Sequence, residues 1–247
     1  MHATPPVPVP AGSTSTAGPS NVGPSNTVGP SSEPGGLADV LAGIERGEMP
    51  PADGALRVVP QPSAQQAAVV AFTAHTVVVA DVEPGWVHAQ LPADDLSAPL
   101  GPPFLSALAA RLGRRVGSLD IAAFAPKAAG EPQLDLAEVT DVDHPRVRRA
   151  HRYRAGVRVW TVEGGVLILG RGLAGRWEAA FEVDPSHRGR GLGRLLARSA
   201  RQLLPADARG VWAQVAPGNA ASVRAVLAAG YQPVGSEVLL VVGQGSG

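Results

Sequence analysis

The sequence predicts an α/β protein of the α+β type, in which helices flank a mixed and mostly antiparallel sheet. Three short apolar stretches, 157–161, 166–169 and 177–183, are separated by tight Gly-rich turns, a pattern typical of an antiparallel meander. After the meander, the chain alternates between helical and strand patterns. Of its 247 residues, 45% are hydrophobic, which is sufficient for a substantial buried core.

Residues 1–36 are predicted to form a disordered tail. This segment contains eight prolines among Ser, Thr and Gly residues, and Glu33 is its single Asp, Glu, Lys or Arg residue. Such a composition buries too little apolar surface to offset the entropy lost when the backbone becomes ordered.

Residues 37–142 are predicted to form a smaller N-terminal α/β lobe. The spacing of apolar residues favours helices at 37–49 and 104–115, and apolar runs favour strands at 77–82 and 118–124. No catalytic motif is recognisable in this lobe, so its role stays open at this point.

The third predicted domain comprises residues 143–247. A helix is expected at 144–154, before the meander. The elements expected after the meander are a helix that begins near Leu192, a strand at 211–215, a helix at 219–229, and strands at 231–234 and 237–242.

Charge is distributed unevenly, although its formal net value is zero. Residues 1–100 carry a net charge of −7 and residues 101–247 a net charge of +7, so a charged partner is expected to meet the second half. The absence of cysteine excludes a disulfide scaffold, a cysteine-ligated metal and a thiol nucleophile. Apolar runs are too short to cross a membrane and the first residues do not resemble a secretory signal, so the cytoplasm is the expected location.

A Gly-rich loop lies between the last strand of the meander and the helix that begins near Leu192. Its glycines, Gly189, Gly191 and Gly193, therefore lie at a helix N-terminus. Backbone N–H groups without intrahelical partners point outward there, and the helix dipole favours an anion such as a phosphate or pyrophosphate. The Walker A and dinucleotide-binding patterns both fail to match this loop.

Two motifs resemble the GNAT superfamily of acyl-CoA-dependent acyltransferases. Arg188-x-x-Gly191-x-Gly193 is similar to the family's R/Q-x-x-G-x-G/A loop, and Asn219-x-x-Ser222 followed by Gly230-Tyr231 is similar to its N-x-x-A/S and G-F/Y ending. The resemblance is confined to about residues 145–243. It implies a GNAT-like domain at 143–247, and it leaves the lobe at 37–142 open to interpretation as a degenerate GNAT-like half.

The resemblance implies a site for acetyl-CoA. In the family, the loop binds the pyrophosphate through backbone amides, and backbone groups of the preceding strand bind the pantetheine arm. The residues that correspond to cofactor-binding positions are Phe181, Val183, Arg188, Gly189, Arg190, Gly191, Leu192, Gly193, Arg194, Asn219 and Ser222.

Glu178 and Glu182 are the candidate catalytic residues. The acceptor amine must lose a proton, and these two carboxylates share one face of the predicted strand because they are separated by an even number of residues. Alternatively, both glutamates form ion pairs, Glu182 with Arg176 or Arg158. Val226 occupies the position where many family members carry a tyrosine that protonates the departing thiolate, so this common acid is missing.

The resemblance therefore implies an N-acetyltransferase that transfers an acetyl group from acetyl-CoA to an amine of a small molecule, peptide or protein, by direct attack in a ternary complex. The alternative is a catalytically weak acyl-CoA-binding sensor or partner-binding module. No metal is expected, since His144 and His151 are too far apart on one helix to share an ion. Nucleic-acid binding is disfavoured because no basic block is interleaved with aromatic residues. The chain is expected to be a monomer or homodimer.

Overall fold

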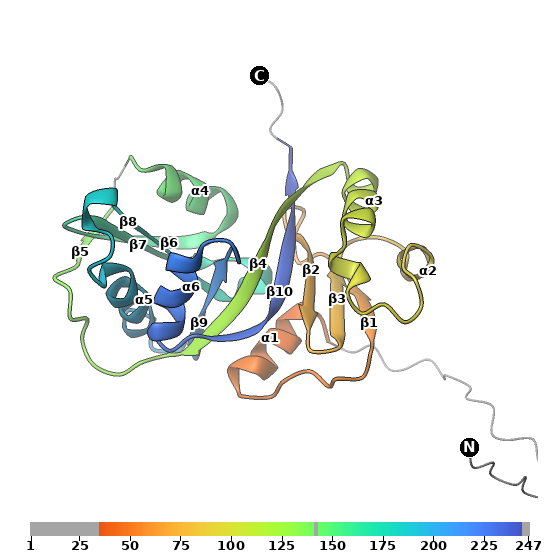
Figure 1. Cartoon of the computed structure of the whole chain (residues 1–247), viewed down its shortest axis with the longest axis horizontal. Helices are drawn as coiled ribbons and strands as arrows, with labels where there is room; N and C mark the ends of the chain where they lie inside the picture. Colours follow the sequence, from red (N-terminus) through yellow and green to blue (C-terminus); the bar gives the residue numbers. More distant parts are fainter. Residues whose placement is uncertain (1–34, 141–142, 244–247) are drawn as a thin grey trace, which may run out of the picture. The chain divides into compact units, whose positions relative to one another are not determined.

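The computed structural model describes residues 35–140 and 143–243 of the chain (Figure 1). Of the tail predicted for residues 1–36, residues 1–34 therefore lie outside the described residues. Gly35 and Gly36 immediately precede the first helix, α1 (Leu37–Glu45).

The described strands form one ten-stranded mixed sheet, in the order β1-β3-β2-β10-β4-β9-β8-β7-β6-β5. The pairs β1–β3 and β8–β9 are parallel, and the neighbouring pairs otherwise are antiparallel. The strands are β1 (Leu56–Val59), β2 (Ala67–Phe72), β3 (His75–Val79), β4 (Arg114–Pro126), β5 (Ala137–Val139), β6 (Ala155–Val162), β7 (Gly165–Arg171), β8 (Trp177–Val183), β9 (Gly210–Val215) and β10 (Gln232–Val242). The predicted fold class is confirmed.

Helices cover both faces of this sheet. They are α1, α2 (Pro84–Ala89), α3 (Pro102–Leu112), α4 (Pro145–Tyr153), α5 (Leu192–Gln202) and α6 (Ala220–Ala228), with short 3₁₀ turns at η1 (Ala98–Leu100), η2 (Leu173–Gly175) and η3 (Pro185–His187). Successive side chains of a strand point to opposite faces. Leu167 and Leu169 of β7 accordingly pack in the cluster of α5 and α6, whereas Val166 and Ile168 pack against α4. By the same alternation, α1 lies on the face of α4, and α2 and α3 lie on the face of α5.

Strands β4 and β10 connect the two halves of the sheet. Figure 1 shows them running side by side, and β4 also pairs with β9 while β10 also pairs with β2. A strand from residues 37–142 therefore lies between two strands from residues 143–247. The domain boundary at residue 142 stays a prediction, but the sheet continues across it.

Several predicted boundaries differ from the structure; for example, the helix predicted at 37–49 ends at Glu45. Two further differences have identifiable reasons. The helix predicted at 104–115 ends at Leu112, because Gly113 adopts a left-handed conformation with φ of 64° and Arg114 begins β4. The two terminal strands predicted at 231–234 and 237–242 are one strand, β10, whose pairing with β4 shifts register between Pro233 and Gly235. Such a bulge lets a strand continue past a proline that cannot donate a hydrogen bond.

Four elements were not predicted, namely β1, β2, α2 and β5. The apolar run Ala67–Phe72 forms β2, which is enclosed on both faces: Ala68 and Val70 pack toward α1, and Ala67 and Val69 pack toward α3. A strand buried on both faces shows no alternation of polar and apolar residues, so periodicity alone does not reveal it.

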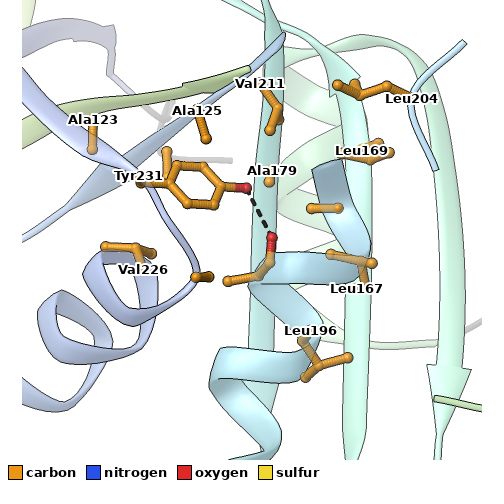
Figure 2. Packing of buried hydrophobic residues seen from close by; sticks show 14 of the residues in the cluster. Ala123, Ala125, Leu167, Leu169, Ala179, Leu196, Leu204, Val211, Val226 and Tyr231 are labelled. Carbon is orange, nitrogen blue, oxygen red and sulfur yellow. Dashed lines mark hydrogen bonds between the residues drawn. The ribbon is translucent and has the colours of Figure 1, made fainter. Parts of the chain in front are cut away.

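The core beneath α5 and α6 fixes the positions of both helices. Figure 2 shows Val226 and Tyr231 packed with Leu196 and Leu167, and the Tyr231 hydroxyl donates a hydrogen bond of 3.1 Å to the carbonyl oxygen of Ala197. Burying these side chains stabilises the arrangement in which the start of α5 lies beside β8 and the start of α6 lies beside the end of β9.

Candidate functional site

Strands β8 and β9 diverge near the middle of the sheet. Strand β8 pairs with β7 along its whole length, but in the described structure it pairs with β9 at a single position, Glu178 opposite Trp212. The edge of β8 that faces β9 is therefore unpaired from Ala179 to Val183. Unpaired backbone N–H and C=O groups at such an opening are available to a ligand.

The Gly-rich loop adopts the geometry of an anion site. Helix α5 begins at Leu192, and Gly191 immediately before it is left-handed with φ of 84°, a conformation that favours glycine. No side chain of the described residues caps this helix. A Cβ atom at Gly189 or Gly191 would meet no described atom within 4 Å, so the space beside these two glycines is open.

The predicted cofactor residues occupy two adjoining places. Phe181, Asn219 and Ser222 line a cavity of about 300 Å³ between β8 and β9. The remaining residues lie along the end of β8 and the loop, where Arg188 Nε donates to the carbonyl oxygen of Val183 at 3.1 Å. These residues are Val183, Arg188, Gly189, Arg190, Gly191, Leu192, Gly193 and Arg194. Their binding of coenzyme A stays a prediction.

Asn219 also has a structural role. Its side-chain oxygen accepts a hydrogen bond of 3.1 Å from the backbone N–H of Ser222, which caps the N-terminus of α6. The cap fixes the direction in which both residues face the cavity.

Glu178 is buried, with 4% of its surface exposed, and is held by four donors. Its carboxylate accepts hydrogen bonds of 2.9 Å from Arg154 and 2.9 Å from Arg176. It also accepts a hydrogen bond of 2.7 Å from the side chain of Gln214 and one of 3.2 Å from the backbone N–H of Leu173. Burial alone would raise the pKa of Glu178, but the positive charges of Arg176 and Arg154 and these hydrogen bonds lower it. A carboxylate engaged in this way is a poor proton acceptor.

Glu182 is more exposed and pairs with helix α4. Its carboxylate accepts a hydrogen bond of 2.8 Å from Arg146, which lowers the pKa of Glu182. Of the two partners predicted for Glu182, Arg176 instead pairs with Glu178 and Glu237, and Arg158 pairs with Glu138.

The two glutamates share one face of β8, as predicted, and that face lies toward α4. Glu182 pairs with Arg146 near the start of the helix, and Glu178 pairs with Arg154 immediately after its end. Both therefore tie α4 to the sheet.

Sequence reasoning missed Asp120, which lines the cavity from β4. Its carboxylate is half-buried and accepts a hydrogen bond of 2.9 Å from the Ser118 hydroxyl. Burial raises the pKa of Asp120; Ser118 and Arg149 oppose this effect and Glu237 adds to it. The available signal was that Asp120 is the one charged residue in the predicted strand at 118–124.

Neither Val226 nor Tyr231 faces the cavity. Val226 is 2% exposed and lies in the core with Tyr231, and burial raises the pKa of the Tyr231 phenol. The chain's other tyrosine, Tyr153 at the end of α4, does line the cavity.

The order β7-β8-β9, the divergence of β8 from β9 and the uncapped glycine start of α5 together reproduce the arrangement that the two sequence motifs imply. Residues 144–231 match the model of the acetyltransferase (GNAT) family. This GNAT segment runs from α4 to the residue before β10 and excludes β1 to β5. The match supports acyl transfer as the general activity of the segment.

Among solved structures, the chain is similar to a protein described as a GCN5-related N-acetyltransferase from Kribbella flavida. The TM-score is 0.36 and the sequence identity 18%, and the alignment covers 57% of this chain. The chain spans about 65% of the length of that structure. No curated protein matches the chain.

Within residues 35–140 and 143–243, no helix is both long and apolar enough to cross a bilayer. The same residues contain no group of three or more His, Asp or Glu side chains placed to hold a metal ion.

Proposed function

We propose that this protein transfers an acetyl group from acetyl-CoA to an amine by direct attack in a ternary complex. The observation that carries the proposal is the divergence of β8 from β9 beside the uncapped N-terminus of α5. This geometry combines an opening between two strands with backbone donors for a pyrophosphate.

The residues present fit coenzyme A. The open amides at the start of α5 and the exposed side chains of Arg188, Arg190 and Arg194 supply positive potential for the phosphates. The unpaired edge of β8, at Phe181 and Val183, supplies backbone partners for the pantetheine amides. A backbone N–H aimed at the thioester oxygen would stabilise the negative charge that develops there during acyl transfer.

The thiolate is a reasonable leaving group without a tyrosine at position 226. A missing general acid costs at most about 10²–10⁴-fold in rate. We therefore propose slow but direct transfer, with an acceptor amine on a small molecule, peptide or protein, in a cytoplasmic monomer or homodimer.

Two substitutions at Gly191 test the cofactor site. Asn and Asp both tolerate the left-handed conformation and differ by one negative charge. Gly191→Asp places that charge where the pyrophosphate would bind, so isothermal titration is expected to give a CoA affinity at least about tenfold weaker than that of Gly191→Asn.

Gly191→Asn is the matched control for backbone strain, and thermal melting checks that both variants fold. Equal CoA affinities in two folded variants would refute the anion site. Failure of the unmodified chain to bind CoA or acetyl-CoA would refute the proposed function.

The alternative, an acyl-CoA-binding sensor, is favoured by one observation: both predicted bases are engaged in ion pairs. Turnover separates the two functions. A chain that binds acetyl-CoA and acetylates no amine is a sensor, whereas release of free CoA that depends on an added amine establishes the transferase.

A further inference from the structure

We infer that Asp120, contributed by the N-terminal half of the chain, accepts the proton of the acceptor amine in the cavity between β8 and β9. This inference rests on the proposed function and extends it. It identifies the acceptor as an amine that arrives as a cation, and it gives the N-terminal half a direct part in the reaction.

The register of the sheet places Asp120 in a row of polar side chains. Asp120 lies opposite Glu237 of β10, and Ala122, two residues further along β4, lies opposite Gln214 of β9. Paired residues and residues two apart share a face, so Asp120, Glu237 and Gln214 point the same way. The hydrogen bond from Gln214 to Glu178 extends the row to β8. Four adjacent strands thus contribute one polar side chain each.

The charges in this row do not cancel. Arg176 bridges Glu178 and Glu237, with distances of 2.9 Å and 2.7 Å, and Arg154 makes a second ion pair with Glu178 at 2.9 Å. The three carboxylates of the row and the two guanidinium groups paired with them leave one negative charge, that of Asp120. Arg149 lines the same cavity and is the cation nearest in effect to this charge, although no ion pair joins the two in the described residues. In the described residues Asp120 forms no ion pair. Asp120 is therefore the carboxylate that remains available to a cationic ligand.

Other charged groups face Asp120 from every side. Glu237 approaches from β10, Glu178 from β8, and Arg146, Arg149 and Arg154 from α4 or its end. Glu237, Glu178, Arg146 and Arg154 are each engaged in ion pairs. Arg149, whose guanidinium lies 5.4 Å from the centre of the Tyr153 ring, lowers the pKa of Asp120, while burial raises it and is the larger effect.

A second cavity adjoins this site on the side away from the Gly-rich loop. It measures about 230 Å³ and lies between α4 and the segment Ser63–Ala67. It shares five lining residues with the first cavity, namely Tyr153, Arg154, Glu178, Leu239 and Val241. None of its lining residues belongs to the Gly-rich loop at the start of α5. We place the acceptor on this side and coenzyme A on the side of the loop, as a ternary complex requires.

The proton transfers balance as follows. The acceptor ammonium gives one proton to the Asp120 carboxylate, which later releases it to water, and the free amine attacks the thioester carbonyl carbon. The new C–N bond forms, the C–S bond breaks, and the second proton of the nitrogen goes to the departing thiolate. The products are the N-acetylated amine, the CoA thiol and one proton.

The test compares full-length wild type with Asp120→Asn, using two small amines as probes at saturating acetyl-CoA. Ethylamine is protonated at pH 7, whereas 2,2,2-trifluoroethylamine is largely deprotonated and needs no base. We expect Asp120→Asn to lower kcat/KM for ethylamine by about 10²–10⁴-fold and to leave kcat/KM for trifluoroethylamine nearly unchanged. Asp120→Glu is expected to restore part of the activity.

The pH profile gives a second measurement. Below its pKa, Asp120 is protonated and accepts no proton, so wild-type kcat/KM should fall as the pH is lowered through that value, which lies above the usual range of an aspartate. With ethylamine, wild type should therefore reach a plateau above that pKa, whereas Asp120→Asn can use only the free amine and its kcat/KM should keep rising with pH. Asp135→Asn makes the same chemical change at an exposed residue outside both cavities and is expected to match wild type.

Each result decides the question. Equal losses with the two probes, or no loss with either, would overturn the role of Asp120 while the proposed function stands. Absence of acetyl-CoA binding in wild type, or of amine-dependent CoA release with every amine tried, would overturn both. Thermal melting of Asp120→Asn is the control for structural damage. Burial disfavours the charged form of Asp120, so replacing it with a neutral residue should not lower Tm.

Discussion

Glu178 and Glu182 lie four residues apart on one face of β8, yet their side chains have different surroundings. The Glu178 side chain is 6% exposed and that of Glu182 is 39% exposed. Removing one partner of a buried ion pair leaves the other charge without compensation, whereas a solvent-exposed pair is weakened by water and salt. The two residues therefore differ in their contributions to stability.

Glu178→Gln is expected to lower the free energy of unfolding by about 3–5 kcal/mol, because Arg154 and Arg176 lose their shared carboxylate. Glu182→Gln, the same change at the more exposed site, is expected to cost less than about 1 kcal/mol. Urea unfolding monitored by circular dichroism measures both. Equal effects would contradict the buried network.

The same network gives stability a pH dependence with a defined sign. The pKa of Glu178 is lower in the folded state than in the unfolded state. Its contribution is therefore fully present above the unfolded pKa and is lost as the pH falls through the folded pKa. The cost of Glu178→Gln should shrink in acid.

At the scale of elements, the two helices beside the cavity begin differently. Helix α6 is capped by the side chain of Asn219, whereas α5 follows Gly191 and has no side-chain cap from the described residues. The chain itself therefore satisfies an N-terminal amide of α6, whereas the N-terminal amides of α5 remain available to an anion.

Asn219→Ala removes the cap of α6 and is expected to cost about 1 kcal/mol of stability, measured by thermal or urea unfolding. Asn219→Asp keeps an oxygen that accepts from Ser222 N–H and adds a charge that the helix dipole favours, so it should retain wild-type stability. Similar losses in the two variants would show that the side chain matters for packing and not for capping.

At the scale of the whole molecule, the sheet depends on β4, a strand of the N-terminal half that lies between two strands of the C-terminal half. Strand β4 supplies six paired positions to β9 and nine to β10. Without it, both strands expose edges that promote aggregation. The GNAT segment therefore relies on a strand that lies outside the family match.

We predict that residues 143–247 expressed alone form no stable monomer, because β9 and β10 lose their shared neighbour. A chain that begins at Gly35 retains every described strand and serves as the control. Size-exclusion chromatography with circular dichroism distinguishes the two. A cooperative, monomeric unfolding transition in the 143–247 fragment would contradict the role assigned to β4.

The sequence by itself determined the local features of the site. The meander, the Gly-rich start of α5, the Asn219 cap and the shared face of Glu178 and Glu182 follow from short-range periodicity and residue type. These features depend on residues close together in the chain, so their physical causes are visible in the sequence.

Only the tertiary structure decided which distant groups meet at the site. The pairing of β4 with β9 and β10 brings Asp120 into the cavity, and the packing of α4 assigns Arg146 and Arg154 to the two glutamates. Strand order and ion-pair partners depend on how whole faces pack together, and many arrangements satisfy the same local pattern. The identity of the available carboxylate is therefore a property of the assembled sheet.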